Sequence, residues 1–167
     1  TLAEARALLG QLGALEGGRI TAHGRRLAAA PMHPRLAHMV LTAPESAGRT
    51  ACRLAALLED RDPLRGAGSD ISVRLRALTG GDAPPQAIGA IKRIGAEAAR
   101  LARRLSAKGD GGDAGALIAR AFPDRIALRR AGDAPRYLLS GGKGARLADD
   151  DGLAGQRLLA VADIDGA

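Results

Sequence analysis

Apolar side chains recur at helical spacing over roughly the first two thirds of the chain, with glycine and proline between the periodic stretches. Thr21 is a suitable N-cap, and Pro34 is suited to the first turn of a helix because it lacks the N–H that a first turn leaves unpaired. Gly17-Gly18 and Gly80-Gly81 are expected to end helices. The pattern predicts helices over residues 2–16, 22–30, from 34 onward, 49–58, 70–78, 84–108 and 114–121.

The pattern changes after residue 122, where short strand-like runs alternate with glycine and aspartate turns. Ser140-Gly141-Gly142-Lys143 is typical of a hairpin turn. Residues 108–113, rich in glycine and aspartate, are the clearest candidate domain boundary. We therefore predict an α+β chain, a mainly α helical bundle followed by a small, partial β region, with strands over residues 126–130, 137–140, 145–147 and 158–164.

The predicted helix over residues 84–108 has two contrasting faces. One is apolar, and the opposite one is basic, with Glu97 as its only acid. Two interpretations remain open for the basic face: a surface that contacts phosphate, or a solvated surface of a segment separated from acidic neighbours. The apolar face carries Ile91, Ile94, Ala98, Leu101, Ala102 and Leu105, and the basic face carries Lys92, Arg93, Arg100, Arg103, Arg104 and Lys108.

Composition narrows the class of protein further. The net charge of +7 and the pI near 10.9 favour polyanionic partners, above all nucleic acid. No apolar run approaches the roughly 18 residues of a membrane span, so no membrane association is expected. The single cysteine, Cys52, excludes an intramolecular disulfide, and together with the absence of a visible leader it points to a cytoplasmic location.

The sequence offers no catalytic constellation. A phosphate-binding loop would need glycine where Tyr137 stands and Ser or Thr where Gly144 stands, and no Asp-Glu-Ala-His motif occurs. The three histidines lack zinc-ligand spacing, and Asp149-Asp150-Asp151 lacks the alternation of a calcium loop and is expected to form a solvated turn. We therefore expect no catalytic residue, metal or cofactor in this chain.

Several short motifs, in order along the chain, resemble the helicase-associated region of DEAH-box ATP-dependent helicases, in particular the bacterial HrpB branch. The resemblance covers roughly residues 5–165. Its motifs are the Ile-Thr-x-x-Gly-x-x-Leu-Ala pattern from Ile20, Pro31-Met32-His33-Pro34-Arg35-Leu36-Ala37-His38-Met39, Asp62-Pro63-Leu64-Arg65-Gly66, Phe122-Pro123-Asp124-Arg125-Ile126-Ala127 and Arg136-Tyr137-Leu138-Leu139-Ser140-Gly141-Gly142-Lys143-Gly144.

The resemblance implies a non-catalytic fragment of a helicase that lies after the motor domains. Residues 1–31 would be the remnant of a winged-helix domain, 32–108 a helical ratchet-like domain, and 109–167 a short helix with a partial OB-like β region. ATP and magnesium would belong to the motor domains of the parent protein, which hydrolyses ATP.

Two sets of partners follow from the resemblance and the charge. In the first, the chain guides single-stranded RNA, or DNA, past the motor domains through basic faces that contact phosphate. In the second, it is a docking module that packs on the motor domains or on an activating protein without touching nucleic acid. The candidate nucleic-acid contacts are Lys92, Arg93, Arg100, Arg103, Arg104, Arg125, Arg136, Lys143 and, as a single base-stacking ring, Tyr137.

Overall fold

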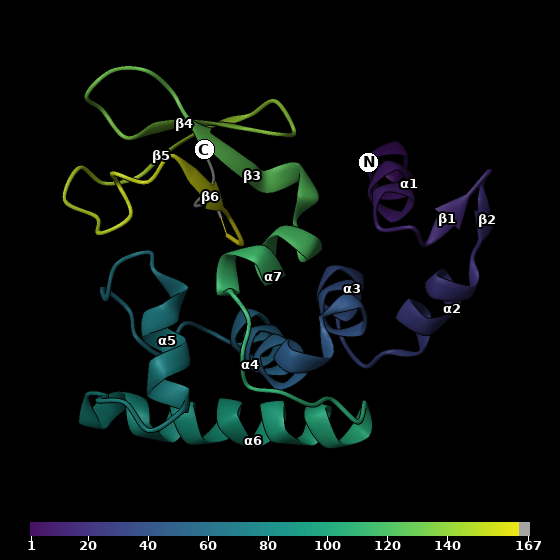
Figure 1. The fold of residues 1–167 in the computed structure, drawn as a ribbon, viewed down its shortest axis with the longest axis horizontal. Helices are drawn as coiled ribbons and strands as arrows, with labels where there is room; N and C mark the ends of the chain where they lie inside the picture. The colour runs from purple at the N-terminus through teal and green to yellow at the C-terminus, as the bar shows by residue number, and fades with distance from the viewer. Residues whose placement is uncertain (164–167) are drawn as a thin grey trace.

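The structure is a computed structural model that describes residues 1–163 (Figure 1). Its α+β class confirms the prediction from the sequence. The helices are α1 (Leu2–Gln11), α2 (Ala22–Ala29), α3 (Pro34–Thr42), α4 (Gly48–Glu59), α5 (Ile71–Leu78), α6 (Ile88–Arg104) and α7 (Ala114–Ala121), with 3-10 turns η1 (Glu45–Ala47), η2 (Pro85–Ala87) and η3 (Pro123–Arg125). The strands are β1 (Leu15–Glu16), β2 (Arg19–Ile20), β3 (Ile126–Arg129), β4 (Arg136–Leu139), β5 (Gly144–Arg146) and β6 (Leu158–Ala160).

Helix starts follow the expected capping chemistry. The Thr21 hydroxyl accepts a hydrogen bond from the Gly24 N–H and begins α2, and Pro34 lies in the first turn of α3. Asp70 caps α5 by accepting from the Ser72 N–H. These local signals were readable in the sequence because each depends on residues within one turn.

Two helices are shorter than the sequence pattern predicts. The first ends at Gln11, because Leu15–Glu16 pairs antiparallel with Arg19–Ile20 in a small hairpin. Gly17 and Gly18, with φ of +55° and +75°, form its turn and do not end a helix. The helix expected over 84–108 begins as α6 only at Ile88, after the 3-10 turn at Pro85–Ala87, and ends at Arg104.

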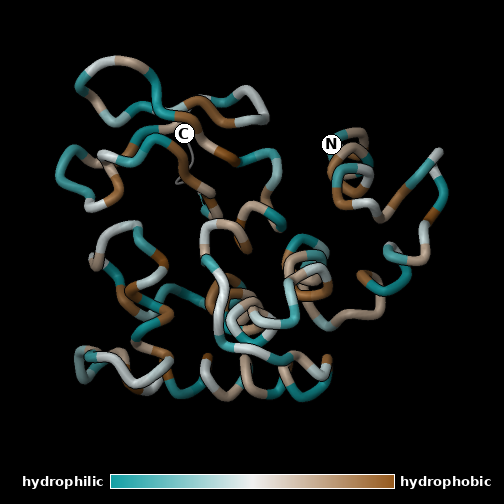
Figure 2. The backbone as a smooth tube through the Cα atoms, in the orientation of Figure 1, coloured by the Kyte–Doolittle hydropathy of each residue, from teal (hydrophilic) through white to brown (hydrophobic). Residues whose placement is uncertain are grey.

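Helix α4 is the centre of the largest hydrophobic core. Its buried side chains are mostly small, including Ala51, Cys52 and Ala55, which are all at most 1% exposed. Small side chains let α3, α6 and α7 approach α4 closely, and Leu54 fills the space that remains. Figure 2 shows hydrophobic segments on the inner turns of these helices and along the strands. Burial raises the pKa of the Cys52 thiol to about 11, so this residue is a packing group.

The glycine-rich segment 108–113 runs tightly along the start of α4. The Arg49 N–H lies 3.2 and 3.0 Å from the carbonyls of Lys108 and Gly109, and the Gly111 N–H donates to the Ser46 carbonyl at 2.8 Å. The following helix, α7, packs in the same core as α3 and α4. The domain limits expected from the sequence stay a prediction, but this segment is held by hydrogen bonds to the bundle.

The β region is an antiparallel sheet with the strand order β5-β4-β3-β6. Its inner face buries Ala127, Tyr137 and Leu139. The hairpin turn predicted at Ser140–Lys143 is confirmed, since the Leu139 N–H donates to the Lys143 carbonyl at 2.8 Å. The last predicted strand, 158–164, is shorter in the structure and ends at Ala160, and residue 164 lies outside the described range.

Arg35 joins the bundle to the sheet. From α3, its guanidinium donates to both carboxylate oxygens of Asp124 in η3, at 2.6 and 3.0 Å, and to the carbonyl of Ala121 at 3.1 Å. The Arg35 side chain is 11% exposed, and its guanidinium lies 5.0 Å from the centre of the Phe122 ring. Hydrogen bonding from Arg35 lowers the pKa of the Asp124 carboxyl below its usual value, despite partial burial.

Gly109→Ala is expected to destabilise the chain by about 2 kcal/mol or more, because Gly109 has φ of +70° and an added Cβ would collide with the Ser46 backbone. The matched control is Gly95→Ala within α6, where a Cβ meets nothing within 4 Å and alanine is the better helix former by about 1 kcal/mol. Urea unfolding followed by circular dichroism measures both variants. Equal stability of the two would contradict the tight packing of this segment.

Asp124→Asn is expected to lower the free energy of unfolding by about 2 kcal/mol at neutral pH, because it removes the charged partner of Arg35. The folded-state pKa of Asp124 is depressed, so the stabilisation is complete above the ordinary aspartate pKa of about 4. It is lost as pH falls from there through the lower folded-state value. The difference between wild type and variant, measured by urea unfolding, should therefore shrink below pH of about 4. The exposed Asp82→Asn is the control; a difference that grew on acidification would refute the assignment.

Candidate nucleic-acid interface

The basic surface of α6 is held in place by the burial of the opposite side of the helix. Ile94, Ala98 and Leu101 are buried, the first two beside Ala56 and Leu57 of α4 and the third in the main core. Helix α6 lies along the outside of the bundle (Figure 1). Its basic side chains are exposed on the other face, spread over about 18 Å of helix axis: Lys92, Arg93, Arg100, Arg103 and Arg104.

Two of these five cations have acidic partners. Arg93 holds both carboxylate oxygens of Asp60 at 3.0 Å, and this contact lowers the pKa of the Asp60 carboxyl. Arg100 pairs with Glu97 one turn away on the same helix. Both arginine side chains are more than 60% exposed, so the pairs contribute little to stability and an anion can compete for the arginines.

The other three, Lys92, Arg103 and Arg104, have no side-chain hydrogen bond or ion pair within residues 1–163. They are exposed on one face of a regular helix, which fixes the spacing of their Cα atoms. The face can therefore offer three unpaired positive charges to a phosphate backbone. Arg93 and Arg100 can also bind phosphate if they release Asp60 and Glu97.

The candidate residues of the β region lie on the other side of the molecule from α6 (Figure 1). Arg125 is engaged internally: its guanidinium donates to the Ala162 carbonyl at 2.7 Å and lies over the Phe122 ring. Arg136 on β4 and Lys143 in the β4–β5 turn are exposed. The structure does not bring the nine candidates together into one surface.

Tyr137 is a core residue of the sheet. It is 2% exposed, and its hydroxyl lies 3.0 Å from the Gln156 carbonyl, with the Leu153 and Ala154 carbonyls slightly farther away. Its ring therefore has no open face on which a base could stack. Tyr137 therefore packs in the core of the sheet, as strand tyrosines usually do.

A groove of about 1330 Å³ lies beside β6, between α7 and the loop that joins α4 to α5. Acidic side chains outnumber arginines along its wall, and Arg35 and Arg74 are already paired with Asp124 and Asp62. The groove therefore lacks the positive potential of a phosphate track. Its acidic members are Glu59, Asp60, Asp62, Asp70, Asp113 and Asp163, and its arginines are Arg35, Arg65, Arg74 and Arg125.

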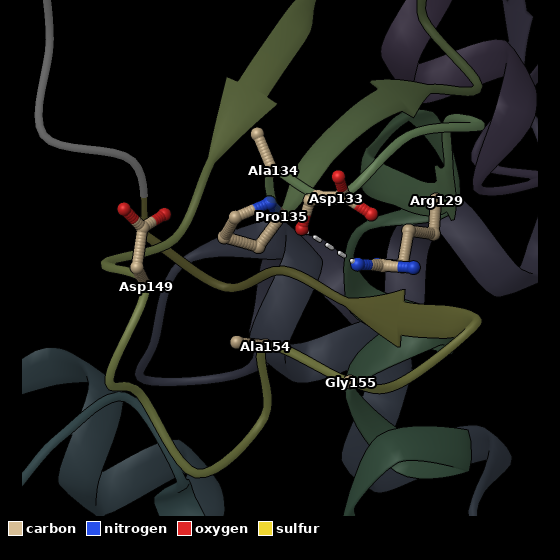
Figure 3. A pocket seen from close by; sticks show the side chains of 7 residues that line it. All are labelled: Arg129, Asp133, Ala134, Pro135, Asp149, Ala154 and Gly155. Atoms are coloured by element: carbon tan, nitrogen blue, oxygen red, sulfur yellow. Dashed lines mark hydrogen bonds between the residues drawn. The ribbon is translucent and has the colours of Figure 1, made fainter.

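A smaller cavity of about 500 Å³ lies where the loop before β4 faces the loop after β5 (Figure 3). Arg129 donates to the Asp133 carbonyl at 3.2 Å, while Asp149 lines the opposite wall beyond Pro135. The lining contains no serine, threonine, cysteine, lysine or histidine, so the cavity offers no pair of a hydroxyl or thiol nucleophile with a histidine base.

The loop over residues 60–70 owes its shape to a buried arginine that the sequence did not reveal. Arg74 binds Asp62 at 2.7 Å and donates to the carbonyls of Leu64 and Gly68. Ser69 donates through its N–H to the Asp151 carboxylate, which also caps the Leu153 N–H. Asp62 therefore stabilises a turn, and Asp151, expected in a solvated turn, holds this loop to the β region.

Two histidines that the sequence separates lie together between α2 and α3. His23 Nε2 is 2.9 Å from His38 Nδ1. Burial, followed by the charges of His23 and Arg120, lowers the pKa of His38.

Within residues 1–163, no group of three or more His, Cys, Asp or Glu side chains could hold a metal ion, and no helix is long and apolar enough to cross a membrane.

Comparison with known proteins indicates the class to which this chain is similar. No family model matches the chain. The chain is similar to proteins that carry a helicase or NTPase description, and in each case it matches one segment of a much longer chain.

The similar proteins named by these comparisons are HrpB of Escherichia coli. The "ATP-dependent RNA helicase HrpB" of strain K12 is 38% identical over an alignment of 156 residues, and the match covers 91% of this chain and 17% of the relative. Two crystal structures, of the E. coli "DExH-box NTPase HrpB" and of the "DEAH/RHA helicase HrpB", share 37% and 35% identity with TM-scores of 0.73 and 0.74. Each covers 94% of this chain, which spans 18% and 19% of them. The chain therefore corresponds to a segment of an HrpB-type protein, and the resemblance is confirmed.

Tyr137→Phe is expected to lower the free energy of unfolding by about 1 kcal/mol, because it deletes one hydrogen bond to the loop that covers the sheet. The affinity for single-stranded RNA should not change, because the ring is buried. Urea unfolding and fluorescence anisotropy with a labelled RNA measure the two quantities. The variant keeps the aromatic ring, so a loss of RNA affinity without a loss of stability would mean that the hydroxyl contacts RNA and would contradict its burial.

Proposed function

We propose that the chain is an accessory, non-catalytic region of an ATP-dependent RNA helicase and guides single-stranded RNA along the outer face of α6. The observation that carries the proposal is the row of exposed cations from Lys92 to Arg104, of which three have no partner within residues 1–163. Its relatives are described as an RNA helicase and as helicase or NTPase structures, which makes RNA the first polyanion to test.

The chemistry of the face favours contact with the backbone over recognition of bases. Lysine and arginine bind phosphate oxygens irrespective of sequence, and each contact releases counterions, so the affinity falls as salt rises. The chain has one phenylalanine and one tyrosine, and both are buried. Such a surface holds a strand without arresting it at a preferred sequence, as a guide for a moving strand requires.

In the longer HrpB-type protein, the motor domains would bind ATP and magnesium and move the strand, while this region keeps it in place. The hairpin β1–β2 beside α2 is compatible with the end of a winged-helix domain, and the antiparallel sheet with the beginning of an OB-like domain. Both assignments belong to the proposal. The rival function, a module that only docks on the motor domains, predicts that the α6 cations do not affect RNA binding.

The triple variant Lys92→Ala, Arg103→Ala, Arg104→Ala is expected to weaken binding of a short single-stranded RNA by about tenfold or more at low salt. The slope of log K against log salt should become shallower by about 2, since each lost phosphate contact removes about 0.7. Fluorescence anisotropy across a salt series measures both quantities.

The matched control removes three exposed arginines elsewhere, as Arg6→Ala, Arg25→Ala, Arg26→Ala in α1 and α2, with the same change of net charge. An equal loss in the control would mean that RNA senses only the overall charge. An unchanged affinity in the α6 variant would overturn the proposal and favour docking.

A further inference from the structure

The face of the sheet opposite Tyr137 carries a row of exposed leucines. Leu128 of β3 is directly opposite Leu138 of β4 on one side and Leu158 of β6 on the other. Their side chains are 50%, 43% and 61% exposed, so the row is open to solvent. Directly paired residues on neighbouring strands point to the same face, so the three side chains form one apolar line across the sheet.

A row of arginines extends from the end of β3 over β4 and β5, two residues away from the leucines of β3 and β4. Arg136 of β4 is directly opposite Arg146 of β5, and the N–H of Arg130, just after β3, donates to the Arg136 carbonyl. Because side chains two residues apart share a face, the arginine row flanks the leucine row. An apolar line and a cationic line therefore run side by side across the sheet.

Within residues 1–163, the arginine row is only partly paired and the leucine row stays exposed. Arg130 and Arg136 have no side-chain hydrogen bond or ion pair among residues 1–163. Arg146 pairs with Asp149, but these side chains are 57% and 71% exposed, so the pair is weak. Like charges directly opposite each other destabilise a sheet, and exposed leucines forgo burial. A partner that brings carboxylates and apolar side chains would relieve both features.

We propose that this face docks an acidic amphipathic helix of a protein partner. A helix advances about 5.4 Å per turn, close to the spacing of about 4.8 Å between strands, so a helix lying across the sheet presents one apolar side chain per turn to each leucine. Acidic residues on the adjoining stripe then face the arginines. No aromatic ring lies on this face, because Tyr137 and Phe122 are buried, so it favours an apolar polypeptide over nucleic-acid bases.

The test uses the chain as it is and a fluorescein-labelled synthetic helix of about 14 residues, four turns, with Leu at helical spacing and Glu on the adjoining stripe. Two control peptides replace every Glu by Lys, or every Leu by Ser. Fluorescence anisotropy measures binding. The Glu–Leu peptide is expected to bind about tenfold or more tightly than either control, because only it satisfies both rows.

Two variants locate the site. Leu128→Thr with Leu138→Thr and Leu158→Thr keeps strand propensity while removing apolar surface, and Arg130→Gln with Arg136→Gln and Arg146→Gln removes the charges. Each is expected to weaken peptide binding about tenfold, a loss typical of central interface residues. Leu2→Thr and the triple Arg6→Gln, Arg25→Gln, Arg26→Gln, at exposed positions away from the sheet, should leave it unchanged. Circular dichroism confirms that each variant is folded.

Equal binding of the Lys–Leu peptide, or unchanged binding by the leucine variant, would overturn the proposal. The face would belong to nucleic acid if the leucine variant lost affinity for single-stranded RNA while the Glu–Leu peptide did not bind, and this outcome would also overturn it. The α6 triple variant should bind the peptide as the wild type does. Failure of the docking proposal and failure of the RNA-guiding proposal are therefore distinguishable.

Discussion

The arrangement of the molecule depends on the contact of Arg35 with Asp124. Arg35 reaches from α3 to the turn that begins the sheet, and in the same place it binds the end of α7 through the Ala121 carbonyl. One guanidinium thus fixes three elements, because its planar fork satisfies a carboxylate and a free helix-end carbonyl together. Without it, the position of the sheet would depend on the α7–β6 packing and on the Ser69–Asp151 hydrogen bond between exposed loops.

The other constraint is the closeness of α4 to its neighbours. Alanine and Cys52 at the α4 surface allow α6 to lie directly against it, with Gly48 at the α4 start in contact with Lys108. The burial of one side of α6 by such packing sets which of its side chains face solvent, so its basic side chains lie together on the outer face. The packing of α6 against α4 and the basic charge on its outer face therefore both follow from the alternation of apolar and basic residues at helical spacing in α6.

Local signals in the sequence predicted most of the helices and the β4–β5 turn, since caps, prolines and glycines act within a few residues. The hairpin at Leu15–Ile20 was missed because a leucine-rich stretch looks helical until its pairing with Arg19 and Ile20 is known. At the candidate site, periodicity correctly put Lys92, Arg103 and Arg104 on an exposed face. It could not reveal that Arg93 binds Asp60, 33 residues away, or that Arg74 is buried, because such contacts depend on the tertiary fold.

The burial of Tyr137 has a practical consequence for anyone who studies this molecule in solution. The chain has no tryptophan and a single tyrosine, and that tyrosine lies in the core of the sheet. Tyrosine emission therefore reports on the β region alone, whereas far-ultraviolet dichroism is dominated by the helices. One sample contains two independent optical probes, and the coincidence or separation of their melting curves shows directly whether bundle and sheet unfold as one cooperative unit.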